Sequence, residues 1–249
     1  KWISKVLNIG RNDLFEPLDD DVILDFLGTN KIKDVLHVKK GLFLEPLKLK
    51  KKLLKHDNIK TILNEKLVSF SEGKDEVLVE FASGLSCSYD ALVICTGKGL
   101  KGLNNNLKTT YGLMAGINDE ESFNITKPLN HNGYIIPKVN GINWIGSTYD
   151  QSPNSKKEGI EKKIKSNYEI FGNENTSYEI QSFWEGERVS AEGNLPLASL
   201  LPNAKSVYCI GALGSRGLSY APFLAEIVSS IIQDKQIPLD KEAFSLLKV

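Results

Sequence analysis

The sequence predicts a mixed α/β fold, in which a sheet-and-helix layer carries an inserted antiparallel layer. Two apolar runs that end at a glycine, Tyr89–Gly97 and Val207–Gly211, are typical of buried strands in one parallel sheet. Residues with helical spacing follow the second run, up to Ile232. Between the two runs, residues 100–149 are rich in Gly, Asn and Thr, which favours antiparallel strands and tight turns.

The first part of the chain predicts short strands around one helix. Residues 1–35 show no strong periodicity, and strands are expected at 34–38 and 41–45. Pro46 favours the start of a helix over residues 46–58, because proline at the first helical position loses no hydrogen bond. The leucines that would form the buried face of this helix are Leu47, Leu49, Leu53 and Leu54. Three strands are expected next: Lys66–Ser71, Val77–Phe81 and Asp90–Cys95.

A hairpin and a helix are expected in the second half. Residues 133–150 read as two strands joined at Val139-Asn140-Gly141, a sequence that suits a tight hairpin turn. A helix beginning at Ser155 has apolar residues on one face, namely Ile160, Ile164 and Tyr168. A last strand at Tyr178–Phe183 precedes a stretch, 184–202, that reads as irregular. This order predicts one domain from 46–100 and 205–249, and another from 1–45 and 101–204.

Composition excludes several classes of protein. The 31 basic residues balance the 31 acidic ones, so net charge favours no partner. No apolar run is long enough to span a bilayer and we see no signal peptide, so we expect no membrane partner and a cytoplasmic location. Three widely spaced cysteines (Cys87, Cys95, Cys209) suit reduced thiols, and the three histidines show no metal-ligand spacing. The chain starts at Lys1 and its single methionine is Met114, which predicts a piece of a longer protein.

The most informative segment is the strand, turn and helix from Val207 to Ile232. Gly211, Gly214 and Gly217 recur at a spacing of three where the strand gives way to the helix. Such a turn aims backbone N–H groups and the positive end of the helix dipole at one place, which favours an anionic ligand. A tight connection without a ligand explains the segment equally well.

Two lysine clusters offer a second kind of site. Residues 31–66 hold eleven lysines against four acidic residues, and residues 156–165 hold five against two. Either cluster suits the phosphate backbone of a nucleic acid, which lysine binds with little geometric demand. A solvated helix face is the other reading, and neither cluster carries the interleaved aromatic residues that stack on single strands.

The string GALGSRGLSYAPFLAE resembles the FAD-dependent oxidoreductase domains of the bifunctional tRNA 5-methylaminomethyl-2-thiouridine biosynthesis family, in the D-amino-acid oxidase and glycine oxidase superfamily. GLFLEPLKL, YDALVICTG, TTYGLMAG, GYIIPKVNGINWIGSTYD and GERVSAEGNLPL resemble further family segments in the same order. The resemblance runs from Gly41 to the end. It implies a truncated FAD-binding layer with an inserted antiparallel substrate domain. The family's strand into G-x-G-x-x-G near the start of this domain is absent from the start of this chain, so FAD binding is expected to be weak or absent unless another chain supplies that unit.

The resemblance implies oxidative removal of the carboxymethyl group from 5-carboxymethylaminomethyl-(2-thio)uridine at the tRNA wobble position, beside a methyltransferase domain of the same parent polypeptide. It places Arg188 on the substrate carboxylate, with Tyr134 as a hydrogen-bond donor to the same group. A surface arginine and an aromatic residue of the sheet are the plain alternatives. The residues it places near non-covalent FAD are Leu67, Thr96, Gly97, Gly214, Ser215, Arg216, Gly217 and Leu218. Gly193 stands where the family has an aspartate.

Two other functions remain open on the sequence. A small-molecule amine or glycine oxidase would share the fold and the flavin chemistry. A catalytically silent fragment or tRNA-docking module would not hold the cofactor, and it would bind tRNA through the lysine clusters.

Overall fold

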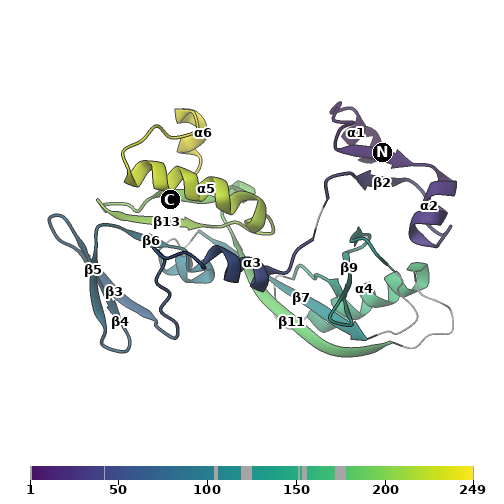
Figure 1. Cartoon of the computed structure of the whole chain (residues 1–249), viewed down its shortest axis with the longest axis horizontal. Coiled ribbons are helices and arrows are strands. Elements are labelled where there is room, and N and C mark those ends of the chain that lie inside the picture. The colour runs from purple at the N-terminus through teal and green to yellow at the C-terminus, as the bar shows by residue number, and fades with distance from the viewer. Residues whose placement is uncertain are drawn as a thin grey trace. The chain divides into compact units, whose positions relative to one another are not determined.

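The computed structural model describes residues 2–41, 43–103, 106–118, 125–150, 152, 156–171 and 178–248. The chain forms two compact units, each built from two separate stretches (Figure 1). The first unit comprises 1–55 and 112–186, and the second comprises 56–111 and 187–249. The sequence placed the boundaries at 45/46, 100/101 and 204/205, whereas the compact units divide at 55/56, 111/112 and 186/187. The functional names given to the two domains stay a prediction.

The first unit is built on a five-stranded sheet. Its strands lie in the order β11 (Glu179–Ser190), β7 (Lys108–Asn118), β10 (Ile142–Gly146), β9 (Tyr134–Val139) and β8 (Leu129–Asn130). β10 pairs antiparallel with both β7 and β9, which confirms the predicted antiparallel layer. The predicted hairpin turn is also confirmed, because Asn140 and Gly141 adopt φ values of 53° and 83° between β9 and β10.

Helix α4 (Lys156–Phe171) packs on this sheet. Ile160 and Ile164 are fully buried against Ala115, Ile117 and Ile145, and Tyr168 packs at the margin of the cluster. The predicted apolar face is therefore confirmed, while the predicted first residue, Ser155, lies outside the described residues.

The remaining elements of the first unit are small. They are α1 (Trp2–Leu7), the antiparallel pair β1 (Phe15–Leu18) and β2 (Val35–Val38), α2 (Asp20–Leu27) and α3 (Pro46–Leu53). α2 was not predicted, although Gly28 ends it with a left-handed φ of 67°. The strand expected at 41–45 is wrong for its described residues. α3 begins at Pro46 as predicted but has no buried residue, and Leu47 is 80% exposed.

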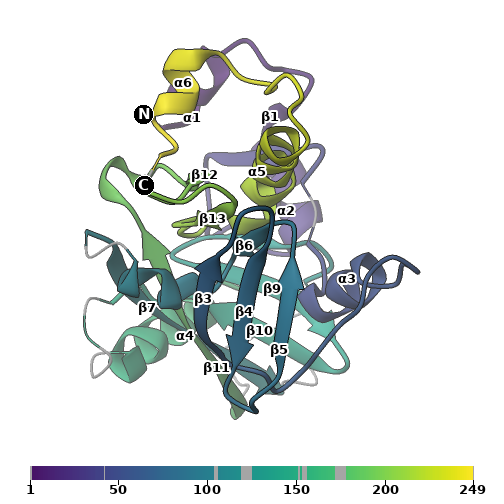
Figure 2. The ribbon, with the colours of Figure 1, turned by 90° about the vertical axis from the view of Figure 1, so that its left-hand side faces the viewer.

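The second unit contains two three-stranded sheets, which Figure 2 shows from one side. One has the order β12 (Leu197–Leu200), β13 (Val207–Gly211), β6 (Leu92–Ile94). β13 runs parallel to β6, with Cys209 opposite Ile94, so the predicted parallel pair is confirmed. The other sheet is antiparallel, in the order β3 (Leu67–Glu72), β4 (Val77–Phe81), β5 (Ser86–Tyr89).

Four helical segments complete the second unit: η1 (Gly97–Gly102), η3 (Glu192–Asn194), α5 (Gly217–Ile232) and α6 (Lys241–Ser245). The stretch 184–202, which was predicted to be irregular, contains the end of β11 and all of β12, so that prediction was wrong. Its Gly, Glu and Pro residues are rare in strands, and β12 is stabilised by pairing with a distant strand, β13.

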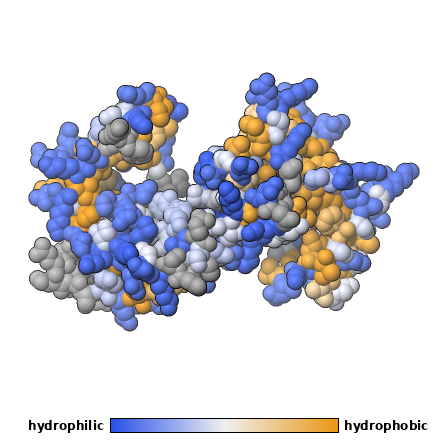
Figure 3. All heavy atoms as spheres, turned by 180° about the vertical axis from the view of Figure 1, so that it is seen from behind, coloured by the Kyte–Doolittle hydropathy of each residue, from blue (hydrophilic) through white to orange (hydrophobic). Residues whose placement is uncertain are grey.

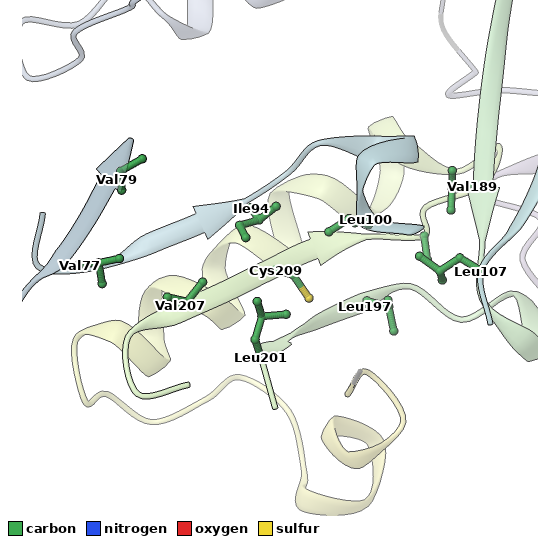
Figure 4. Packing of buried hydrophobic residues seen from close by; sticks show 11 residues of the cluster. Val77, Val79, Ile94, Leu100, Leu107, Val189, Leu197, Leu201, Val207 and Cys209 are labelled. Carbon is green, nitrogen blue, oxygen red and sulfur yellow. The ribbon is translucent and has the colours of Figure 1, made fainter. Parts of the chain in front are cut away.

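β13 is buried on both faces, as its apolar run predicts. On one face Leu224, Ile227 and Val228 of α5 pack against Tyr208 and Ala198. On the other face lies the cluster drawn in Figure 4: Val77, Val79, Ile94, Leu100, Leu107, Val189, Leu197, Leu201, Val207, Cys209 and Ala212.

The surface also carries apolar side chains. Figure 3 shows orange areas on the unit that contains β3–β6, where Val68 is 64% exposed and Val93 is 37% exposed. On the segment after α3, Leu63 is 68% exposed.

Candidate functional site

Two turns leave the same edge of the parallel pair in the second unit. β6 is followed by Thr96 and Gly97, and β13 ends at Gly211 and is followed by Ala212. Because parallel strands end at a common edge, the structure brings the two turns together. Ligands of open α/β sheets bind in the crevice outside the carboxyl ends of the strands.

The turn after β13 is shaped by left-handed residues. Ala212 and Gly214 have φ values of 54° and 56°, a region where only glycine is free of strain from a side chain. The Gly214 N–H donates to the carbonyl of Val189 at 2.9 Å, and Leu213 forms an isolated bridge with Ser190. These contacts fasten the glycine turn to the end of β11.

Free backbone donors gather where α5 begins. The Arg216 N–H donates to the Leu213 carbonyl at 3.0 Å, and Ser219 and Tyr220 both donate to the Arg216 carbonyl. Within the part of the chain that the structure describes, the N–H groups of Ser215, Gly217 and Leu218 have no acceptor. The first N–H groups of a helix need outside partners, so this turn is suited to oxygen atoms of a ligand.

A polar cavity of about 460 Å³ opens beside these donors. Its lining residues come from the end of β11, the turn of η3 and the glycine turn: Ser190, Gly193, Asn194, Gly214, Ser215 and Arg216. Ser190 and Asn194 were not predicted. The Gly-Asn pair at 193–194 is typical of a turn, but nothing in the sequence connects that turn to the glycine turn after β13.

The side chain of Arg216 is engaged with protein groups. Its Nη1 donates to the Tyr220 hydroxyl at 3.0 Å, and its Nη2 donates to the Asn194 carbonyl. Its guanidinium carbon lies 4.9 Å from the centre of the Tyr220 ring. The structure therefore uses two donors of this side chain inside the protein.

Gly97, Gly99 and Gly102 have the spacing G-x-G-x-x-G directly after β6, and this spacing was not recognised in the sequence. They open a short 3₁₀ segment rather than an α-helix. Lys98 pairs with Glu187 at 2.9 Å, and Lys101 bonds the Thr109 hydroxyl at 3.2 Å. A Cβ atom on Gly99 would lie 2.8 Å from Oγ1 of Thr96, so this glycine serves the close packing of the turn.

Arg188 and Ser190 project from the same face of β11, since alternate residues of a strand share a face and Val189 between them is buried in the core. Arg188 is half-buried and lies two residues from the cavity lining. Tyr134 is 44% exposed and opens β9 in the first unit, opposite Gly146. Leu67 opens the edge strand β3 and packs against the core of the second unit.

The lysine clusters are partly occupied by protein partners. Lys48 pairs with Glu45 at 2.6 Å and Lys162 with Glu158 at 2.5 Å. Lys31 donates to the Glu169 carbonyl at 3.0 Å, and Lys163 to the Asn132 carbonyl at 2.9 Å. Other lysines of α3, such as Lys51, are exposed.

The three cysteines are free thiols. Cys209 is a core residue, and burial raises the pKa of its thiol, whereas Cys95 lies beyond the end of β6 and is exposed. Across the described ranges, no group of three His, Cys, Asp or Glu side chains is placed to hold a metal ion. No helix among the described residues has the length and apolar character needed to cross a membrane.

The curated relatives are tRNA-modification proteins. The tRNA 5-methylaminomethyl-2-thiouridine biosynthesis bifunctional protein of Pseudoalteromonas atlantica is 26% identical over 148 residues, which cover 47% of this chain and 21% of that protein. The protein of the same name from Polaromonas naphthalenivorans is 27% identical over 135 residues, 48% of this chain and 21% of its own length. The chain thus matches about a fifth of each relative. No protein-family profile matches the chain.

Several solved structures with a similar fold are oxidases, and others are L-amino acid deaminases. Glycine oxidase from Bacillus cereus superposes with a TM-score of 0.79 at 17% identity, over 95% of this chain and 71% of that one. Iminodiacetate oxidase from Chelativorans gives 0.74 at 13% identity, over 97% and 69%. L-α-Glycerophosphate oxidase from Mycoplasma pneumoniae, solved with FAD bound, gives 0.73 at 13% identity, over 96% and 71%. The chain therefore has the fold of the FAD-dependent oxidases, and about half of its sequence is similar to the bifunctional tRNA-modification proteins.

Proposed function

We propose that the chain is part of an FAD-dependent oxidoreductase acting on a CH–NH group. Its substrate would be 5-carboxymethylaminomethyl-(2-thio)uridine at the tRNA wobble position, converted to 5-aminomethyl-(2-thio)uridine with release of glyoxylate. The observation that carries the proposal is the polar cavity at the N-terminus of α5, with three free N–H groups at its edge. The sequence relatives are named for the biosynthesis of 5-methylaminomethyl-2-thiouridine in tRNA, which supports tRNA as the substrate, and the carboxymethylaminomethyl group is implied by the family resemblance.

The residues present fit part of a flavin cofactor. The free donors of Ser215, Gly217 and Leu218 suit the oxygen atoms of a flavin ring edge or a phosphate, and Gly214 leaves room for close approach. Thr96 and Gly97, at the same edge of the sheet, and Leu67, on the edge strand β3, are proposed as further contacts. When bound, FAD would accept a hydride from the carbon next to the amine nitrogen, and water would then hydrolyse the resulting imine to glyoxylate and the aminomethyl base.

The protein's own groups would bind and orient the substrate. Arg188 is proposed to pair with the carboxylate of the carboxymethyl group, since a planar guanidinium binds a carboxylate through two parallel hydrogen bonds. Tyr134 is proposed to donate a hydrogen bond to the same group. The exposed lysines of α3 and α4 are proposed to attract tRNA phosphates.

The proposed partners and location follow from the relatives. The relatives are named bifunctional, which supports a second activity in the parent protein, and the family resemblance implies that this is a methyltransferase domain. Because the proposed substrate is tRNA, we propose that the protein acts in the cytoplasm.

A small-molecule amine or glycine oxidase is the second candidate, and the folds of glycine oxidase and iminodiacetate oxidase favour it. The two candidates differ in whether RNA is needed. The test incubates the chain with FAD and either tRNA carrying the carboxymethylaminomethyl group, free glycine or free sarcosine, and measures glyoxylate. We expect glyoxylate with the modified tRNA as substrate and none with glycine or sarcosine. Turnover of glycine or sarcosine without tRNA favours the small-molecule oxidase, and a chain that binds tRNA without turnover is a docking module.

Arg188→Ala is expected to raise the apparent KM for the modified tRNA by about 10- to 100-fold, the cost of losing hydrogen bonds to a charged group. The FAD dissociation constant should change less than about twofold, because Arg188 is not among the proposed cofactor contacts. Arg11→Ala is the control, since Arg11 pairs with Asp13 on the surface of the first unit. An unchanged KM in Arg188→Ala contradicts the carboxylate assignment.

A further inference from the structure

The turn of η3 forms one wall of the polar cavity and has few backbone bonds of its own. Gly193 and Asn194 adopt left-handed φ values of 67° and 56°. The turn is closed by one backbone bond, from the Asn194 N–H to the Ala191 carbonyl at 3.1 Å. Since β12 begins only at Leu197, the wall lies between two strand ends rather than on a strand.

The opposite wall is better fastened. Gly214 is tied to β11 through the Val189 carbonyl, and α5 behind the turn is anchored by Leu224 and Ile227, which are 1% and 0% exposed. The cavity therefore has one wall fixed by packing and one wall that depends on a few hydrogen bonds.

Arg216 connects the two walls. It is the N-cap residue of α5, and its side chain reaches across to donate to the Asn194 carbonyl. The hydroxyl and ring of Tyr220, one turn along α5, hold the guanidinium in place. The ammonium group of a lysine has a single nitrogen. It lacks the planar fork that lets the guanidinium of Arg216 donate from two nitrogens, one to Asn194 and one to Tyr220.

We propose that Arg216 is a positioning residue that holds the η3 turn against the start of α5 and so fixes the width of the cavity. The consequence for the cofactor rests on the proposed function. Two of the five guanidinium N–H groups serve the protein contacts described above. The main contribution of Arg216 to flavin binding is therefore to hold the η3 turn in place before the flavin binds.

The test uses Arg216→Lys, Arg216→Ala and Tyr220→Phe, with Arg11→Ala as the control for loss of an arginine elsewhere. Hydrogen exchange of the Asn194 amide, measured by NMR without any ligand, reports the wall directly. The Gly214 amide serves as an internal reference, because its acceptor is Val189 and not a partner of Arg216. FAD binding is measured in parallel by equilibrium dialysis, and urea unfolding shows whether each variant folds.

We expect exchange at Asn194 to rise about tenfold or more in both Arg216 variants and less in Tyr220→Phe, with Gly214 unchanged. The FAD dissociation constant should rise by about tenfold in Arg216→Lys, which keeps the charge but not the planar fork. Unchanged exchange at Asn194 in Arg216→Lys and Tyr220→Phe overturns the proposal, even if Arg216→Ala fails to fold. Wild-type protein that binds no FAD contradicts the proposed function, and the exchange data still decide the role of Arg216.

Discussion

Leu224→Ala is expected to lower the free energy of unfolding by about 2–5 kcal/mol, the usual cost of removing a buried leucine side chain. Leu224 is 1% exposed and lies in the cluster that joins α5 to Tyr208 of β13 and Ala198 of β12. Because this packing anchors the helix whose first turn lines the cavity, the variant should also bind FAD more weakly. Urea unfolding followed by circular dichroism measures the stability.

Leu218→Ala is the matched control for Leu224→Ala. Leu218 lies in the first turn of the same helix but is 60% exposed. Its truncation should change the free energy of unfolding by less than about 0.5 kcal/mol, as is usual for surface positions. Equal losses in the two variants would show that α5 does not pack on the sheet as described.

Gly211→Ala is expected to destabilise the protein by about 1–3 kcal/mol, the range for overpacking a filled core. A Cβ atom at position 211 would lie 2.0 Å from Cδ1 of Leu100, which is 2% exposed and has little room to move. Leu100 belongs to η1, so its displacement should also disturb the Thr96–Gly97 turn at the same edge of the sheet. Thermal unfolding measures the loss.

Gly102→Ala provides the comparison, because no atom lies within 4 Å of a Cβ built at this position. This change in the same 3₁₀ segment should be neutral, or stabilising by up to about 1 kcal/mol through a less flexible unfolded chain. If Gly211→Ala is as stable as Gly102→Ala, the close contact between η1 and the end of β13 is wrong.

The parts of the fold that were predictable are those with a local pattern. The apolar run at Val207–Gly211 is a buried strand, as its composition predicts, and Asn140-Gly141 encodes its own turn. The run at Leu92–Ile94 is a strand in the predicted place, but only Ile94 is buried, so its predicted burial was wrong for Val93. Ile160 and Ile164 identify the buried face of α4 from spacing alone. In each case the residues that define the element lie within one short window of sequence.

The parts that were missed depend on distant partners. β12 is short and lies among turn residues, and it is a strand because β13 pairs with it. The engagement of Arg216 with Asn194 joins residues 22 positions apart, and no periodicity reports it. In α3 the leucine spacing suggested a buried face, yet Leu47 and Leu53 are 80% and 65% exposed, because amphipathic spacing does not itself provide a surface to pack against.

The residues of the candidate site also fall into those that the sequence predicts and those that only the tertiary structure shows. Gly214, Ser215, Gly217 and Leu218 were predicted from the glycine spacing and the resemblance, and the structure places them around free N–H groups. Ser190 and Asn194 entered only through the tertiary fold. The substrate roles of Arg188 and Tyr134 stay predictions that rest on the resemblance.

The most direct test of the flavin site is equilibrium dialysis of the chain against FAD, with Gly214→Val in parallel. At a φ of 56° a β-branched residue is strained, so this variant should distort the turn that presents the free N–H groups. We expect weak but saturable binding of one FAD per chain, weakened further by about tenfold or more in Gly214→Val, since a strain of about 1–2 kcal/mol and misplaced donors both oppose binding. Absence of saturable binding, or equal binding by the two proteins, would contradict a flavin site at the start of α5.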